Sequence, residues 1–200
     1  MSAGPGGYLL TPADGSQLWF LDTRMSVKAG AAQTGGAFTL IEWSAPAGFG
    51  PPRHQHDRED EAFYLLAGEI TVDCGDQRWT AGPGDFVFLP RGIPHSFMAG
   101  DGQVHGLQIT APAGFERFIA EAGRPAGHPG LPEPGPPDIP RLIDAARRHG
   151  QQILGPPPSS APSLVEPALN ARADAMPGPS PAGCDCEQKQ PPAGTRMEGT

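Results

Sequence analysis

Three histidines and one glutamate stand at spacings that suit a metal site. One residue separates His54 from His56, Glu61 follows after a short polar link, and His95 closes the loop Pro90-Arg91-Gly92-Ile93-Pro94. On a strand, side chains two residues apart lie on the same face with Cβ atoms roughly 6–7 Å apart, so the two neighbouring histidines can bind one cation from one side. Three neutral imidazoles and one carboxylate suit one divalent ion of Fe, Ni, Co, Mn, Cu or Zn, and an octahedral ion so bound keeps two positions for substrate and for dioxygen or water. The pattern predicts a metal site with an open side.

Other polar groups have simpler interpretations. The His54-x-His56 triplet, taken alone, is also compatible with an exposed strand that carries two surface imidazoles. The charged run at residues 57–60 is typical of a solvated turn. His128 falls in a proline-rich connector and His149 at the end of an expected helix, where a favourable interaction with the helix C-terminus accounts for it. Cys184 and Cys186 lie in a Pro/Gly-rich tail, and we assign them no site.

The first half of the chain has the pattern of a β protein. Apolar or alternating runs are cut by Gly, Pro and Asp about every ten residues, which is typical of an antiparallel sandwich or barrel. Gly75-Asp76 separates two such runs, and a two-residue Gly-X link suits a hairpin turn. The expected strands are residues 17–22, 25–29, 37–44, 62–66, 69–74, 78–81, 85–89, 96–99 and 103–110.

The rest of the chain has helix and linker patterns. Every aromatic residue lies at or before Phe118, so a second core is not expected. Apolar residues at helical spacing predict a helix over 115–122 and another from Pro140 to His149, joined by an extended proline-rich connector. We expect a β-barrel over 7–112, a helical and extended segment packed on it over 113–157, and a disordered Pro/Gly-rich tail over 158–200.

Charge and composition restrict the classes of partner that are expected. The chain has 14 basic and 22 acidic residues, a formal net charge of −8, and no basic run that would neutralise a phosphate backbone, so no nucleic-acid partner is expected. There is no basic leader and no stretch of about 18 apolar residues, which predicts a cytoplasmic protein without a membrane partner. Its three cysteines form no disulfide framework.

Two longer patterns carry a resemblance. Gly48-x5-His54-x-His56-x4-Glu61-x6-Gly68, followed by Gly84-x5-Pro90-x-Gly92-x2-His95, resembles the paired signature of the cupin superfamily. One position departs from it, because Ala99 stands where cupins often have Asn. Residues 35–42, 110–118 and 149–157 resemble the single-domain quercetin 2,3-dioxygenase-like (monocupin) proteins of bacteria, so the resemblance covers about residues 7 to 157.

The resemblance implies a fold and a site. The expected fold is all-β, a double-stranded β-helix (jelly-roll) barrel with short C-terminal helices. His54, His56, Glu61 and His95 are the implied metal ligands, and Glu61 is the implied catalytic residue, since the equivalent carboxylate of the family also acts on the substrate hydroxyl. The metal of the family is iron, nickel, cobalt, manganese or copper. A homodimer paired through sheet edges is also expected.

Four further side chains are candidates for a substrate pocket. Phe63, Leu65 and Phe97 share the strand parity of the implied ligands, so we expect them to line the cavity, although core packing alone would require the same residue types. His105 lies in the run 103–110, where its alternation with Leu107 and Ile109 would place all three on one face; there it serves either ordinary packing or the pocket as a polar group.

Three functional hypotheses remain. The first is a dioxygenase that acts on an enolisable or aromatic, flavonol-like small molecule with O2, in which Glu61 takes the proton of the substrate hydroxyl. The second is a non-oxidative cyclase or isomerase of polyketide-like substrates, in which Zn polarises a carbonyl. The third is a cupin that binds a small molecule without catalysis, which an intact set of four ligands disfavours. The natural substrate stays open.

Overall fold

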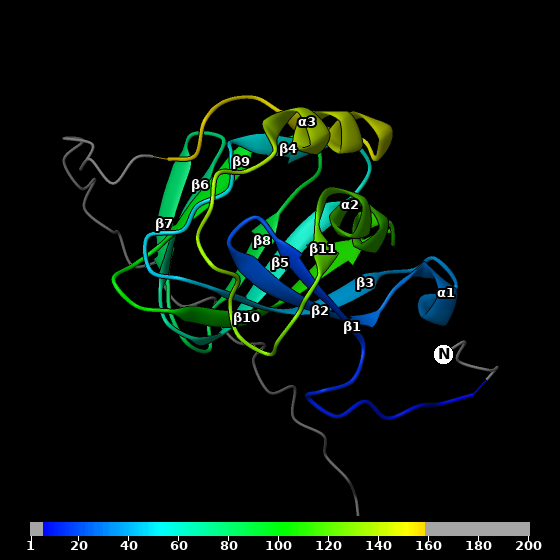
Figure 1. Ribbon diagram of the computed structural model, residues 1–200. Coiled ribbons are helices and arrows are strands. Elements are labelled where there is room, and N and C mark those ends of the chain that lie inside the picture. Colours follow the sequence, from blue (N-terminus) through cyan, green and yellow to red (C-terminus); the bar gives the residue numbers. More distant parts are fainter. Residues whose placement is uncertain (1–5, 159–200) are drawn as a thin grey trace, which may run out of the picture. The chain divides into compact units, whose positions relative to one another are not determined.

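Two antiparallel sheets enclose the core of this computed structural model, which describes residues 6–158 (Figure 1). From edge to edge, the larger sheet contains β11 (Arg124–Pro125), β1 (Ser16–Phe20), β2 (Thr23–Ala29), β3 (Thr39–Ala45), β10 (Val104–Ala111), β5 (Asp60–Ala67) and β8 (Phe86–Leu89). The smaller sheet contains β12 (Gln151–Ile153), β4 (His54–His56), β9 (His95–Ala99), β6 (Ile70–Cys74) and β7 (Gln77–Ala81).

Strand order places the two histidine segments next to each other. Strand β4 pairs with β9, and His54 lies directly opposite His95 in this pair. The hairpin predicted at Gly75-Asp76 is confirmed, since Cys74 pairs with Gln77 across the turn. Gly75 has a φ of +57°, which the first position of a type II′ turn requires and glycine adopts without strain.

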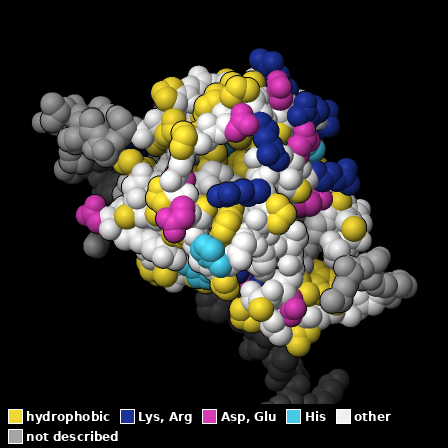
Figure 2. Space-filling view, in the orientation of Figure 1, with side chains coloured by type: hydrophobic (Ala, Val, Ile, Leu, Met, Phe, Trp, Pro, Cys, Tyr) yellow, Lys and Arg dark blue, Asp and Glu magenta, His cyan; other side chains and the backbone are white. Residues whose placement is uncertain are grey.

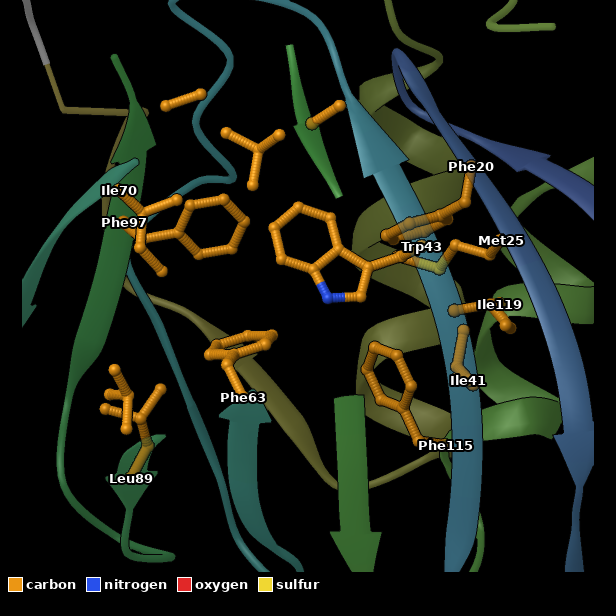
Figure 3. Packing of buried hydrophobic residues seen from close by; sticks show 14 of the residues in the cluster. Phe20, Met25, Ile41, Trp43, Phe63, Ile70, Leu89, Phe97, Phe115 and Ile119 are labelled. Carbon is orange, nitrogen blue, oxygen red and sulfur yellow. The ribbon is translucent and has the colours of Figure 1, made fainter. Parts of the chain in front are cut away.

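Aromatic side chains from both sheets fill the space between them. Trp43 on β3 is only 2% exposed. Its ring lies 5.5 Å from Phe63 on β5 and 5.4 Å from Phe97 on β9, measured between centroids, and Figure 3 shows these rings converging from opposite sheets. Such tilted contacts bind the two layers together more strongly than their buried area alone.

Three helices complete the described part of the chain: α1 (Ala31–Thr34), α2 (Phe115–Ala122) and α3 (Ile139–Arg148). The longer two are amphipathic and each buries one face against the core; the buried residues are Phe115, Phe118, Ile119, Leu142, Ala145 and Ala146. Glu121 at the end of α2 ties the two helices together, because it pairs with His149 at 2.7 Å and with Arg148. Lys and Arg side chains gather on the side of the molecule where these helices lie (Figure 2).

The predicted all-β class with short C-terminal helices is confirmed. Four short elements lie outside the expected ranges, namely α1, β4, β11 and β12, because segments of two to four residues carry too little periodicity to be recognised. Strand β12 follows α3 and pairs with β4, so the segment after the barrel completes the smaller sheet. The disordered tail predicted from residue 158 lies, beyond that residue, outside the described part. No helix in the described range is long and apolar enough to cross a bilayer.

An apolar patch covers the outer face of the larger sheet at its β8 edge. It consists of Tyr64, Leu66, Phe86, Phe88 and Ile109, each 38–62% exposed. Tyr64 pairs with Phe86 across β5 and β8, so aromatic groups of neighbouring strands lie side by side. Contiguous exposed aromatic surface of this kind is unusual for a monomer.

Candidate metal centre

The four residues singled out in the sequence come together between the two sheets. His54 and His56 lie on β4, His95 begins β9, and Glu61 reaches across from β5 of the larger sheet. One possible ligand atom from each of these residues lies within 4.8 Å of those of the other three. Glu61 Oε2 is 3.1 Å from His95 Nε2 and 3.9 Å from His56 Nε2.

Backbone carbonyls orient two of the imidazoles. His54 Nδ1 lies 2.8 Å from the carbonyl oxygen of Pro52, and His95 Nδ1 lies 2.9 Å from that of Ile93. A carbonyl oxygen only accepts, so each Nδ1 carries the proton and donates it, which leaves the lone pair on Nε2. Both rings are held in the tautomer that a metal ligand needs.

Side chains orient the third imidazole. His56 Nδ1 lies 3.2 Å from Glu59 Oε2, and the same oxygen accepts a hydrogen bond of 2.9 Å from Gln151 Nε2 on β12. Glu59 is only 5% exposed. A buried carboxylate behind a histidine fixes its orientation and strengthens the opposite nitrogen as a donor.

The unpaired nitrogens fit a cation. His56 Nε2 and His95 Nε2 are buried and make no hydrogen bond among the described residues; because the proton of His95 is on Nδ1, its Nε2 faces Glu61 Oε2 at 3.1 Å as one acceptor against another. A buried polar atom without a partner is costly, so it calls for a ligand. With bonds of about 2.1 Å, ligand atoms of one ion lie about 3.0–4.2 Å apart, so a contraction of a few tenths of an ångström completes the site.

Charge also suits a cation. Burial, together with the neighbouring His95, holds the pKa of His54 at about 3, so this ring is neutral at pH 7. Burial acts to raise the pKa of Glu61, but the surrounding imidazoles outweigh it and hold that pKa at about 2. Glu61 is therefore an anion, and its Oε1 accepts a hydrogen bond from Gln108 Nε2.

A small cavity opens beside Glu61 and His54. We call it the inner cavity; its volume is about 50 Å³. Its wall is mainly apolar and aromatic and includes two of the four candidate pocket residues, Phe63 and Phe97. Leu65 does not line it, because this side chain is fully buried within the core. The segment after the barrel closes one side of the cavity, with Phe115 and Phe118 of α2 and Leu142 of α3. The complete lining is Phe20, Leu21, Thr23, Met25, Trp43, Phe49, Pro51, Pro52, His54, Glu61, Phe63, Phe97, Gln108, Phe115, Phe118, Leu142, Gln151 and Ile153.

His105 lies away from the cavity. Residues 104, 106, 108 and 110 of β10 are buried, so His105 belongs to the opposite, outer face. There its Nδ1 contacts Ser44 Oγ at 3.0 Å and its Nε2 lies 3.3 Å from Glu42 Oε1. Assigning His105 to the pocket therefore follows the wrong parity of β10, and Gln108 is the polar side chain of this strand that faces Glu61.

The sequence did not predict three side chains that support the clustered residues. Gln108 was hidden by the wrong parity of β10, and Gln151 sits in a strand too short to predict. Glu59 belongs to the charged run expected to be a solvated turn, but this interpretation is wrong, since Glu59 is buried against His56. Its neighbour Asp60 holds the loop that delivers His95, because Arg91 donates to it from N, Nε and Nη2 at 2.6–2.9 Å.

Comparison with known proteins bears on this centre. Residues 42–109, which include all four clustered residues, match the family model of the cupin domain. The chain contains a cupin domain. This domain is distantly homologous to quercetin 2,3-dioxygenase of Bacillus subtilis, with 29% identity over 122 residues, which are 60% of this chain. The chain matches only 36% of that relative's length.

Solved structures resemble the barrel loosely. Oxalate decarboxylase from Bacillus subtilis aligns with a TM-score of 0.48 and 18% identity over 56% of this chain and 31% of its own. KdgF from Halomonas sp. aligns with a TM-score of 0.43 and 18% identity over 48% of this chain and 84% of its own. The two antiparallel sheets of this cupin are those of a jelly roll.

Proposed function

We propose that this cupin is a metal-dependent dioxygenase that oxidises an enolisable or aromatic, flavonol-like small molecule with O2. The observation that carries the proposal is the set of three imidazoles and one carboxylate, with buried, unpaired Nε2 atoms, beside a cavity with an aromatic wall. The distant homology to quercetin 2,3-dioxygenase supports the choice of reaction.

The contacts suggest which residues would hold the ion and what the ion would contribute. His54, His56, Glu61 and His95 would hold one divalent ion, with Fe, Ni, Co, Mn or Cu suited to redox chemistry and Zn to the alternative below. Such an ion, when bound, supplies stabilisation of negative charge on an enolate oxygen and a redox partner for O2.

Glu61 has a second task. Its carboxylate is ionised and held through Oε1 by Gln108, so it is positioned to take the proton of a substrate hydroxyl that enters the inner cavity. The aromatic wall, including Phe63 and Phe97, excludes water from the reacting atoms.

The test combines metal content with oxygen consumption. Protein purified without added metal is analysed by mass spectrometry for metals, and oxygen uptake is followed with quercetin as substrate. Redox-active metal with uptake supports the proposal. Zinc without uptake would replace it by a non-oxidative cyclase or isomerase of polyketide-like substrates, and absence of metal by a binding cupin without catalysis.

Matched variants sharpen the test. His54→Ala and His95→Ala are expected to lower metal content and oxygen uptake together. His105→Ala is the control, since its imidazole lies on the outer face and contacts Glu42. Loss of metal in the control to the same extent would contradict the assigned ligand set.

A further inference from the structure

A second, larger cavity lies against the inner one. We call it the outer groove; its volume is about 630 Å³. A single water needs about 10–15 Å³ by this measure, so the inner cavity of about 50 Å³ has room for only a few atoms. The outer groove falls in the range of about 300–1,000 Å³ that is typical of small-molecule sites. The inner cavity near Glu61 therefore holds only a small terminal group of a ligand, which we call the head. The rest of a larger ligand would have to bind outside this cavity.

The two cavities share a wall. Leu21, Phe49, Pro52 and Leu142 line both of them, and we call these four residues the constriction. Leu21 has a φ of +52°, the only positive φ outside glycine among the described residues. An L residue seldom adopts this conformation. The tight turn between β1 and β2 thus holds an apolar side chain at the boundary between groove and cavity, where a strained backbone often marks a functional position.

The wall of the outer groove holds an aromatic ring and a cation side by side; the ring of His128 also packs edge-on against Trp19, with 4.7 Å between centroids, so only part of the indole is exposed to the groove. Arg124 lies over the ring of Trp19, with its Cζ 5.0 Å from the ring centroid, and both residues line the groove where β1 pairs with β11 (Figure 1). Trp19 is fixed by a hydrogen bond of 3.0 Å from its Nε1 to the carbonyl of Gly130. Arg124 has no side-chain hydrogen bond or ion pair recorded within residues 6–158, so its guanidinium is free to bind an anion.

The other charged groups of the groove are differently engaged. Arg141 donates to the carbonyl oxygens of Glu121 and Gly123, and Asp138 accepts from the backbone N–H of Arg141 in the first turn of α3. Two further carboxylates, Asp22 and Glu133, also line the groove. An anion is therefore best accommodated at Arg124, whose guanidinium lies over Trp19 and offers several N–H donors to an anion.

We propose that the outer groove binds the body of the substrate, a flat apolar molecule that carries an anionic group, with the body against Trp19, the anion at Arg124 and the head passing the constriction toward Glu61. The inference rests on the proposed function only for the last of these three contacts. It explains how a site with a very small inner cavity serves a substrate with an aromatic body.

Binding to the groove is tested without turnover and without metal. The probe is 1-anilinonaphthalene-8-sulfonate, a flat aromatic anion, titrated into the full chain by fluorescence and compared with the neutral N-phenyl-1-naphthylamine. We expect one bound sulfonate per chain, tighter than the neutral analogue, and about tenfold weaker binding in Arg124→Gln and in Trp19→Leu. Arg78→Gln and Trp79→Leu are the controls, since Arg78 is already paired with Asp73 and neither residue lines the outer groove.

Two results would overturn this assignment. Equal binding of both probes, unchanged in Arg124→Gln, would remove the anion site. Binding that survives both groove variants but is lost in Phe86→Ser would place the probe on the apolar patch instead. Because Arg124 is exposed, its substitution tests the groove even if Trp19→Leu folds poorly.

The route to the metal is tested by the rate of metal removal. Pyridine-2,6-dicarboxylate is added to metal-loaded protein, and release is followed with and without saturating anilinonaphthalene sulfonate. We expect the bound probe to slow release several-fold and Leu21→Gly to accelerate it, since glycine suits the positive φ and removes a side chain from the constriction. Leu9→Gly, at a position 89% exposed, is the control. Rates unaffected by both changes would show that the metal is reached by another route, whereas a protein that holds no metal would refute the proposed function and leave the fluorescence test intact.

Discussion

Replacement of Glu59 by glutamine tests the support behind His56. The change keeps the shape of the side chain and one acceptor oxygen but removes the negative charge that faces His56 Nδ1 at 3.2 Å. Hydrogen bonds to a charged group contribute about 1.5–3 kcal/mol and neutral ones roughly half as much, so the expected loss is about 1–2 kcal/mol. Metal affinity should therefore fall about 5- to 30-fold.

The assay is a competition titration of metal-free protein with a chromophoric chelator, accompanied by the melting temperature of the same metal-free samples. Asp57→Asn is the matched control, because Asp57 belongs to the same charged run but pairs with Gln152 on the surface. Parental affinity in Glu59→Gln, or an equal loss in both variants, would refute the reasoning that this carboxylate tunes the imidazole.

Three further predictions follow from other contacts. Glu61→Gln should keep part of the metal on three imidazoles but lose turnover per bound metal by about 10²–10⁴, as measured on one preparation for both quantities. Burial acts to raise the pKa of Glu116, but hydrogen bonds from Thr39 and backbone N–H groups outweigh it and hold that pKa below its usual range. This stabilisation is therefore present above the unfolded pKa of about 4.3 and is lost as the pH falls through the lower folded pKa. At pH 7, Glu116→Gln should lower the free energy of unfolding by about 1 kcal/mol, and with it the melting temperature. The difference between variant and parent should shrink in acid. We propose that the expected homodimer forms through the apolar patch, because a two-fold contact would bury this patch on both copies. The double variant Phe86→Ser, Phe88→Ser should then have half the parental molecular mass by light scattering.

Each of these predictions has a contrary outcome. Near-parental turnover per metal in Glu61→Gln would reject its role as a base. A melting difference in Glu116→Gln that persists unchanged at pH 3 would show that packing, and not charge, is affected. A parental mass in the double serine variant, as in the control Leu9→Ser, would exclude the patch as the dimer contact.

The strands of the barrel were predictable because they obey simple patterns. Alternation of apolar and polar residues marks β6, and the turn at Gly75 sets the register of its hairpin without help from distant residues. The spacing of His54, His56, Glu61 and His95 likewise indicated which side chains the fold brings together.

What the sequence concealed depends on contacts between distant segments. Gln151 meets Glu59 only because β12 pairs with β4, and nothing local indicates that pairing. The parity of β10 was misjudged because its outer face also carries apolar residues, such as Ile109 at 38% exposure, so hydrophobicity alone does not distinguish its two faces. Glu59 is polar and adjacent to other charges, and only its contacts with His56 and with the distant Gln151 account for its burial.

The hydrogen bond from Gln151 connects the centre to β12, an edge strand of the smaller sheet. Because β12 and the preceding α3 dock onto the barrel while Gln151 supports the partner of His56, we expect metal binding and docking of this segment to be thermodynamically linked. A ligand that binds the docked form better must, by the same free energy, oppose undocking. Addition of metal should therefore slow amide hydrogen exchange in α3 and β12 more than in β2. The exchange rate of α3 would then indicate whether the metal site is occupied, although no residue of α3 is a metal ligand.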